Sequence, residues 1–119
     1  MIRSVKRISA IFLLGILTTG CATNNNLHNW GNYENNLFNY YDRPELQEAI
    51  VASQIEFLRE LENSGKRPAP GLFAEAGTFL LLEGDRKGAI EFYQKEHDAW
   101  PESRPMMSVL INNLKDEQS

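Results

Sequence analysis

Apolar positions recur at helical spacing along most of this chain. Aromatic and aliphatic residues lie three and four positions apart over residues 30–41, which places them on one face of a helix. The same spacing returns over 45–62, about 72–82, about 86–100 and 103–114. No stretch alternates between apolar and polar residues with a period of two. The pattern therefore predicts an all-α fold.

Turn and capping residues separate these runs. Asp42 and Pro44 precede the second run, and a glutamate three residues after Asp42 gives the spacing of a capping box. Gly65 is placed to end the second helix in the left-handed conformation, and Pro101 to end the fourth. Ser103 is placed to cap the fifth. We expect the inner face of the second helix to consist of Leu46, Ala49, Ile50, Ser53, Phe57, Leu58 and Leu61.

The segment 66–71 (KRPAPG) is basic and extended, and it joins the second and third helices. Its two prolines fix φ and bias the residues before them toward extended backbone. We therefore take Arg67 and Pro70 as candidates for contact with a partner.

The pattern from Gly77 to Pro101 resembles a tetratricopeptide repeat, a helix-turn-helix unit of about 34 residues. Gly77 and Ala89 are small where two antiparallel helices would cross closely, and Tyr93 fills the space beside them. Glu96 stands where the repeat has a small residue, which predicts weaker packing against the following helix. The full pattern comprises Gly77, Leu80, Gly84, Asp85, Ala89, Tyr93 and Pro101.

A shift of 40 residues superposes a fainter copy of this unit and places Leu37 on Gly77. The resemblance thus implies about two tetratricopeptide-like helical hairpins plus a C-terminal capping helix with a polar outer face. A plain helical bundle without repeat ancestry remains the alternative.

The first 20 residues have the composition of an export signal. Three basic residues precede an apolar run over residues 8–17. Ten residues in a helix span about 15 Å, half of a hydrocarbon core of about 30 Å, so this run is too short to cross a membrane.

Residues 17–21 (LTTGC) resemble the lipobox of bacterial lipoproteins, in which the cysteine is acylated and becomes the new N-terminus. The resemblance implies a signal peptide over 1–20, a lipidated tether over 21–29 and a helical domain over 30–119. It also implies acyl chains such as palmitate on Cys21. Because Ala22 stands where an aspartate favours retention in the inner membrane, it implies an outer-membrane location, facing the periplasm. An ordinary secretory signal followed by an unrelated cysteine is the alternative.

Charge narrows the choice of partners. The first 20 residues hold three of the 12 Lys and Arg and none of the 16 Asp and Glu, so residues 21–119 carry a net charge of −7. Phosphate binding requires a basic patch, so we expect no nucleic-acid partner. The single cysteine excludes an intrachain disulfide and a cysteine-based zinc cluster.

Few side chains suit catalysis. His28 lies beside the tether, and His97 has no partner at metal-ligand spacing. The serines lack a nucleophile motif. Glu75 lies one turn into the third helix, where it either stabilises the helix N-terminus or contacts Arg67 or a partner. We expect neither an enzyme nor a cofactor nor a metal, and keep a hydrolase using Glu75 as a remote alternative.

The aromatic content favours binding. Eleven of the 12 aromatic residues follow the signal, more than a body of this size can bury, so we expect one exposed aromatic patch. The candidate partner-binding residues are Trp30, Tyr33, Tyr40, Arg67, Pro70, Glu75 and Trp100.

Three runs carry a further resemblance: residues 30–34 (WGNYE), 68–77 (PAPGLFAEAG) and 96–103 (EHDAWPES), the last followed by two methionines. Over residues 30–114 the chain is similar to an uncharacterised family of small bacterial lipoproteins, a domain of unknown function. Its members are often encoded beside lipoproteins related to the curli secretion channel, which suggests such a lipoprotein as partner.

These observations predict an outer-membrane lipoprotein that acts as a non-catalytic adaptor or assembly factor for a cell-envelope or secretion-related complex. The alternative is a structural envelope lipoprotein that binds peptidoglycan or the membrane and has no dedicated protein partner.

Overall fold

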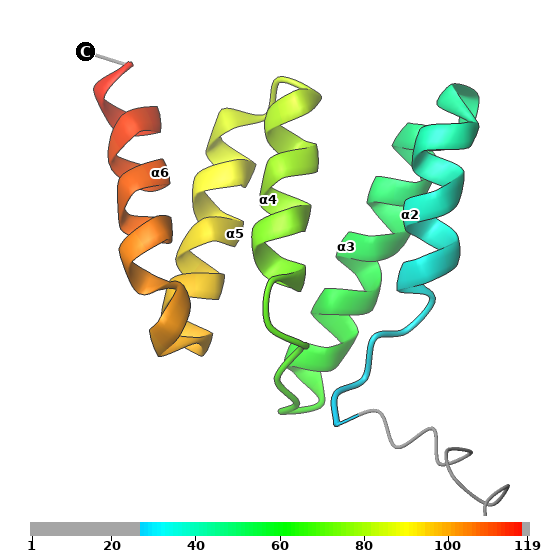
Figure 1. Cartoon of the computed structure of the whole chain (residues 1–119), viewed down its shortest axis with the longest axis horizontal. Helices are drawn as coiled ribbons and strands as arrows, with labels where there is room; N and C mark the ends of the chain where they lie inside the picture. Colours follow the sequence, from blue (N-terminus) through cyan, green and yellow to red (C-terminus); the bar gives the residue numbers. More distant parts are fainter. Residues whose placement is uncertain (1–26, 118–119) are drawn as a thin grey trace, which may run out of the picture.

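The computed structural model describes residues 27–117 (Figure 1). Within this range the chain is helical and contains no strand, so the predicted all-α class is confirmed. The predicted signal peptide and Cys21 lie outside the described residues. The elements are α2 (Tyr33–Asp42), η1 (Pro44–Leu46), α3 (Gln47–Asn63), α4 (Leu72–Leu82), α5 (Arg86–Ala99), η2 (Pro101–Ser103) and α6 (Arg104–Asp116).

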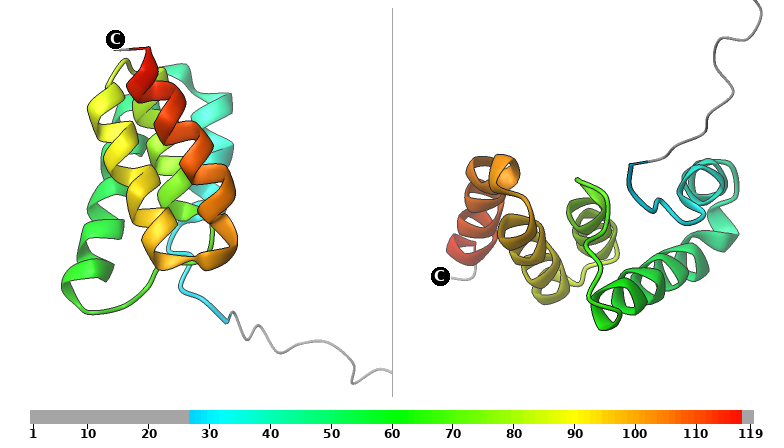
Figure 2. Two further views of the ribbon diagram at one scale, coloured as in Figure 1. Left: turned by 90° about the vertical axis from the view of Figure 1, so that its left-hand side faces the viewer. Right: turned by 90° about the horizontal axis from the view of Figure 1, so that it is seen from below.

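The helices stand side by side in a row, with α2 and α6 at its two ends (Figure 1). Seen along the helices, the row is a zigzag: α2, α4 and α6 lie along one side, and α3 and α5 along the other (Figure 2, right). Residues 27–32 run between α2 and α4 on the first side. We call this side the α2/α4/α6 face.

A close crossing of α4 and α5 forms the centre of the fold. A Cβ atom at Gly77 would lie 2.9 Å from the Tyr93 ring and 3.1 Å from the Ala89 carbonyl oxygen, so only glycine fits there. Beside the crossing, the Thr78 and Tyr93 hydroxyl oxygens are 2.9 Å apart. The predicted close approach at Gly77 and Ala89 is therefore confirmed. The last residues of α2 and α4, Asp42 and Leu82, are 40 residues apart, which is the shift at which the sequence superposes on itself.

The inner face of α3 differs from the prediction. Leu46, Ala49 and Ser53 are exposed, and Phe57 is half-buried. The buried face of α3 is turned relative to the predicted one. The cause is that α3 contacts both α2 and α4, so its buried residues face the groove between these two helices. The buried residues of α3 are Ile50, Val51, Gln54, Leu58 and Leu61.

Two predicted caps are wrong and one cap was missed. Asp42 ends α2 and does not cap the second helix, because Pro44 opens a 3-10 turn before α3 begins. Ser103 precedes α6 but its hydroxyl makes no cap hydrogen bond. Asp85, in contrast, caps α5 by accepting the Gly88 N–H at 2.8 Å. Gly65 has φ 72°, as predicted for the end of α3.

Glu96 joins three segments of the chain, although the sequence predicted weaker packing at this position. Its side chain is fully buried. Its Oε1 accepts hydrogen bonds from the Gly71 N–H at 2.9 Å and from the Ser103 hydroxyl at 2.8 Å. The carboxyl group thus connects the start of α4 with α5 and η2, and the expectation that it loosens the packing is wrong.

Candidate partner-binding face

The exposed large apolar side chains concentrate on alternate helices. Neither α3 nor α5 exposes one, although these are two of the five α-helices in the row. Within the described range, the exposed large apolar side chains that belong to α-helices therefore all lie on α2, α4 and α6. With the exposed fraction of each, they are Phe38 (67%), Tyr41 (72%), Leu82 (69%), Met106 (65%) and Val109 (57%).

The aromatic part of the α2/α4/α6 face follows α2. A shallow groove of about 590 Å³ runs along the helix and has apolar walls. Glu34 and Asp42 border it, and α2 contains no basic residue. The predicted exposed aromatic patch is confirmed, but its most exposed members, Phe38 and Tyr41, were not among the candidates.

Acidic residues gather where α2 and α4 end. Burial raises the pKa of Glu83, and the negative charges of Glu48 and Asp85 raise it further. Asp42 ends α2, and neither α2 nor α4 has a basic residue in its last turn. The partial negative charge of the two helix C-termini adds to these carboxylates, and Arg43 stands beside them at the C-cap of α2.

A cavity of about 110 Å³ lies beside the groove, between the start of α2, the middle of α3 and the first residue of α4. Gln54 lines it and is only 5% exposed, and its Nε2 is buried without a hydrogen-bond partner. The α2 side and the α3 side of the cavity each contribute both aromatic rings and polar side chains. The lining residues are Trp30, Asn32, Tyr33, Asn36, Ser53, Gln54, Phe57 and Leu72.

The segment before α2 closes one wall of this cavity. Gly31 has φ +58°, and a Cβ there would lie 2.8 Å from the Phe57 ring, so the backbone packs directly on that ring. The Gly31 N–H donates to Asn29 Oδ1 at 3.0 Å. The Trp30 and Tyr33 rings are 5.5 Å apart, which holds both at the mouth of the cavity.

Glu75 faces Tyr33 from α4. Burial raises the pKa of Glu75, and the Tyr33 hydroxyl partly opposes that shift by hydrogen bonding to the carboxylate. The pKa of Tyr33 is raised by burial and by Glu75. The suggested contact of Glu75 with Arg67 is not formed in the described part of the chain, because Arg67 lies elsewhere.

Arg67 and Trp100 form a separate contact. The guanidinium carbon of Arg67 lies 3.7 Å from the centroid of the Trp100 ring, and Nη1 donates to the Ala99 carbonyl at 3.1 Å. His28 meets the same ring edge-on at 5.4 Å. Trp100 is 6% exposed, and Pro70 is half-buried. This contact binds the 66–71 segment to the end of α5.

Tyr40 is also buried. It is 7% exposed, and its ring stacks on Phe79 of α4 with centroids 4.3 Å apart. The burial of Tyr40 and Trp100 gives both a packing role. Of the sequence candidates, the structure brings Trp30, Tyr33 and Glu75 together. It places Arg67 and Trp100 in a second contact, and it leaves Pro70 half-buried in the 66–71 segment.

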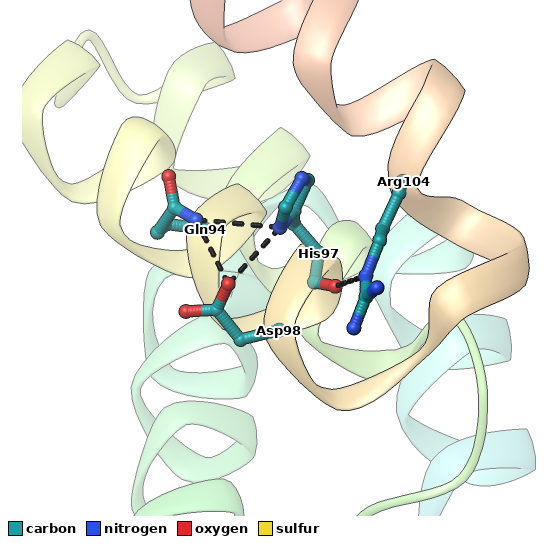
Figure 3. A network of polar contacts seen from close by, with 4 residues as sticks. All are labelled: Gln94, His97, Asp98 and Arg104. Carbon is teal, nitrogen blue, oxygen red and sulfur yellow. Dashed lines mark hydrogen bonds and ion pairs between the residues drawn. The ribbon is translucent and has the colours of Figure 1, made fainter.

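Titratable groups gather at the end of α5 without forming a metal site (Figure 3). His97 Nδ1 lies 3.0 Å from Asp98 Oδ1, which also accepts from Gln94 Nε2 at 3.0 Å. These hydrogen bonds lower the pKa of Asp98, and the hydrogen bond with His97 contributes most to this shift. Arg104 Nε donates to the His97 carbonyl at 3.1 Å and ties α6 to α5.

No group of three or more His, Cys, Asp or Glu side chains within residues 27–117 is arranged to hold a metal ion. None of the helices in the same range has the length and apolar character needed to cross a bilayer.

Residues 27–110 match the family described as a domain of unknown function, DUF4810. The match spans well over half of the chain, so the protein belongs to this family. The expectation of an uncharacterised family is thereby confirmed. No curated protein and no solved structure matches the chain.

Proposed function

We propose that this protein is an outer-membrane lipoprotein that acts as a non-catalytic adaptor or assembly factor. It would hold a cell-envelope or secretion-related protein on its α2/α4/α6 face. The observation that carries the proposal is that α2, α4 and α6 expose large apolar side chains, whereas α3 and α5 expose none. Extensive exposed apolar patches on a folded protein mark interaction sites.

Acylation of Cys21 would supply the second part of the mechanism. Several acyl chains on one residue anchor a protein far more firmly than one chain does. Confinement to a membrane raises the effective concentration of the adaptor for partners in the same membrane. Residues 27–32 run on the α2/α4/α6 side, so the proposed tether would join the body on the side of its binding face.

The charges of the face define the partner's chemistry. Glu34 and Asp42 border the aromatic groove, and Glu83 stands in a cluster of like charges at one edge. A complementary partner presents apolar side chains flanked by lysine or arginine. The family resemblance suggests a curli-secretion-channel-like lipoprotein as that partner. Nucleic acid is not expected to bind, because residues 21–119 carry a net charge of −7.

Co-purification from detergent extracts after crosslinking in intact cells tests the proposal. We expect a stoichiometric envelope protein to be recovered with the wild type, and at least tenfold less of it with Phe38→Glu/Tyr41→Glu. The matched control is Ala49→Glu/Ala52→Glu, which adds the same charge at two exposed positions of α3. Equal recovery with both double variants would contradict the assignment of the face.

Two further results would replace the proposal. Retention on isolated peptidoglycan or on protein-free membrane, without a protein partner, would establish the structural-lipoprotein alternative. An unchanged distribution of Cys21→Ser between envelope and soluble fractions would remove the acyl anchor. A hydrolase that uses Glu75 requires Glu75→Gln to lose the phenotype of the wild type, and we expect full retention.

A further inference from the structure

We propose that the cavity lined by Gln54 is an anchor pocket for a polypeptide. It takes one apolar side chain, of about the size of leucine, while the neighbouring backbone carbonyl accepts a hydrogen bond from the Gln54 carboxamide. This inference rests on the proposed function, because it specifies part of the partner that the face would hold.

The size of the cavity limits its occupant. Its volume is about 110 Å³, whereas sites for cofactors and drug-sized ligands measure roughly 300–1,000 Å³. A cavity of about 150 Å³ holds a benzene molecule. The space therefore suits a group of four or five heavy atoms, which is one aliphatic side chain.

The walls select an apolar group. Trp30, Tyr33 and Phe57 contribute aromatic rings, and Leu72 contributes the aliphatic wall. Trp30 is 37% exposed at the edge of the body, so its ring can cover an inserted group. At protein interfaces, a few side chains that fill well-packed, desolvated pockets carry most of the binding energy.

Gln54 selects the second feature of the occupant. A buried amide without a hydrogen-bond partner is costly and calls for an explanation. Gln54 lies on the cavity wall with its Nε2 unpaired. A polypeptide supplies a carbonyl oxygen beside every side chain.

The pocket is largely formed before binding. The contact of Gly31 with the Phe57 ring fixes the 27–32 segment over α3. Asn35 Nδ2 donates to Asn32 Oδ1 at 2.8 Å, which orients the polar rim of the first turn of α2. A preformed wall reduces the conformational entropy lost on binding.

A glycan is the competing occupant, since aromatic rings and amides also line sugar sites. A sugar ring has more heavy atoms than the four or five that fit, and its hydroxyl groups need several hydrogen-bond partners. Gln54 is the one lining residue with a buried side-chain polar atom left unpaired in the described range. These two points favour the polypeptide.

NMR titration of the ¹⁵N-labelled mature lipoprotein in detergent micelles tests the pocket. The probes are N-acetyl-leucine methylamide, N-acetyl-alanine methylamide and N-acetylglucosamine. We expect the leucine probe to shift the Gln54 side-chain NH₂ and Trp30 indole signals with a roughly millimolar dissociation constant. The alanine probe should bind about 50-fold more weakly, because it lacks three carbon groups worth about fourfold each.

Substitutions then test the hydrogen bond. Gln54→Leu removes the donor while keeping a side chain of similar size, and should weaken the leucine probe about five- to tenfold. Its effect is read from the Trp30 indole signal. The control Gln94→Leu makes the same change at an exposed position of α5, and should leave binding unchanged.

Several results would overturn the pocket: no shift with the leucine probe, equal binding of the leucine and alanine probes, unchanged affinity in Gln54→Leu, or binding of N-acetylglucosamine alone. The outcome is separable from that of the proposed function. Recovery of a protein partner without binding of the leucine probe would remove the pocket only. Binding of the leucine probe without a protein partner would remove the adaptor function only.

Discussion

The two helical hairpins of this chain follow each other at nearly the same spacing and yet pack very differently. The α4 and α5 helices are in contact along much of their length, whereas α2 and α3 are in contact over far less. At the closest point of the second hairpin stands Gly77. The position 40 residues earlier holds Leu37, which is half-buried. The Gln54 cavity lies on the side of this more open hairpin, between α2, α3 and the first residue of α4.

The ends of the helices differ in the same way. Asp85 caps α5, and Glu96 connects α5 to its neighbours. Neither α2 nor α3 has a side-chain cap. One half of the body is thus fixed by packing and hydrogen bonds, and the other half leaves aromatic side chains free. The exposed aromatic side chains of the candidate binding surface, Phe38 and Tyr41, thus lie on the less tightly packed hairpin, whereas α4 and α6 contribute aliphatic side chains to it.

The largest effect is expected at the close crossing. Gly77→Val places carbon atoms within the contact distance of the Tyr93 ring, and overpacking of this kind costs about 3 kcal/mol. The melting temperature should fall by about 10–20 °C. Leu37→Ala, at the corresponding half-buried position of α2, should cost about 1 kcal/mol. Thermal unfolding followed by circular dichroism measures both, and equal losses would show that the hairpins are packed alike.

Tyr40→Ala should loosen one hairpin selectively. The Tyr40 ring stacks on Phe79 and joins α2 to α4, so its removal costs about 2–3 kcal/mol, mostly in the attachment of α2. Amide hydrogen exchange should become faster throughout α2 and stay unchanged in α5. Faster exchange in both helices would mean that the body unfolds as one unit.

Glu96→Ala should destabilise the tighter half by about 2 kcal/mol, because the Gly71 N–H and the Ser103 hydroxyl lose their acceptor. Glu96→Gln keeps an oxygen in the place of Oε1 and should cost less than half as much. Chemical denaturation separates the two variants. If both lost the same stability, the buried carboxyl group would contribute through something other than these two hydrogen bonds.

Much of the fold could be predicted from the sequence, because helical spacing and turn residues are local signals. The ends of α4 and the left-handed Gly65 agree with the prediction. The burial of Tyr40 beside an exposed Tyr41 could not be predicted, since it depends on how α2 is rotated against α4. Gln54 was missed for the same reason, because the inner face of α3 was placed on other residues.

Contacts between distant segments were also beyond the sequence. The Glu96 hydrogen bond to Gly71 joins residues 25 positions apart, and the Arg67 bond to Ala99 joins residues 32 apart. Spacing within one helix carries no information on either. The aromatic excess did predict that a patch exists. It could not distinguish the buried rings from the exposed ones.

The smallest expected effect concerns the charge of Glu75, which interacts with Tyr33. Burial raises the pKa of Glu75 above its ordinary value of 4.5, so the unfolded chain ionises at lower pH than the folded one. The stability that Glu75 contributes is therefore present below pH 4.5 and is lost as the pH rises through the raised pKa. Glu75→Gln removes this pH-dependent loss of stability, because the glutamine side chain does not ionise. At pH 7 it should raise the melting temperature by about 1–3 °C, after allowance for solvent screening.

The same substitution should have no effect at pH 4, where the carboxyl group is protonated in the folded protein. Glu102→Gln, at an exposed position in η2, serves as the control and should change neither value. A gain at pH 4 as large as that at pH 7 would show that the glutamine side chain packs better than the native glutamate, and that charge is not the cause. A gain confined to neutral pH means that the protein keeps a destabilising carboxylate next to Tyr33, a residue that lines the cavity.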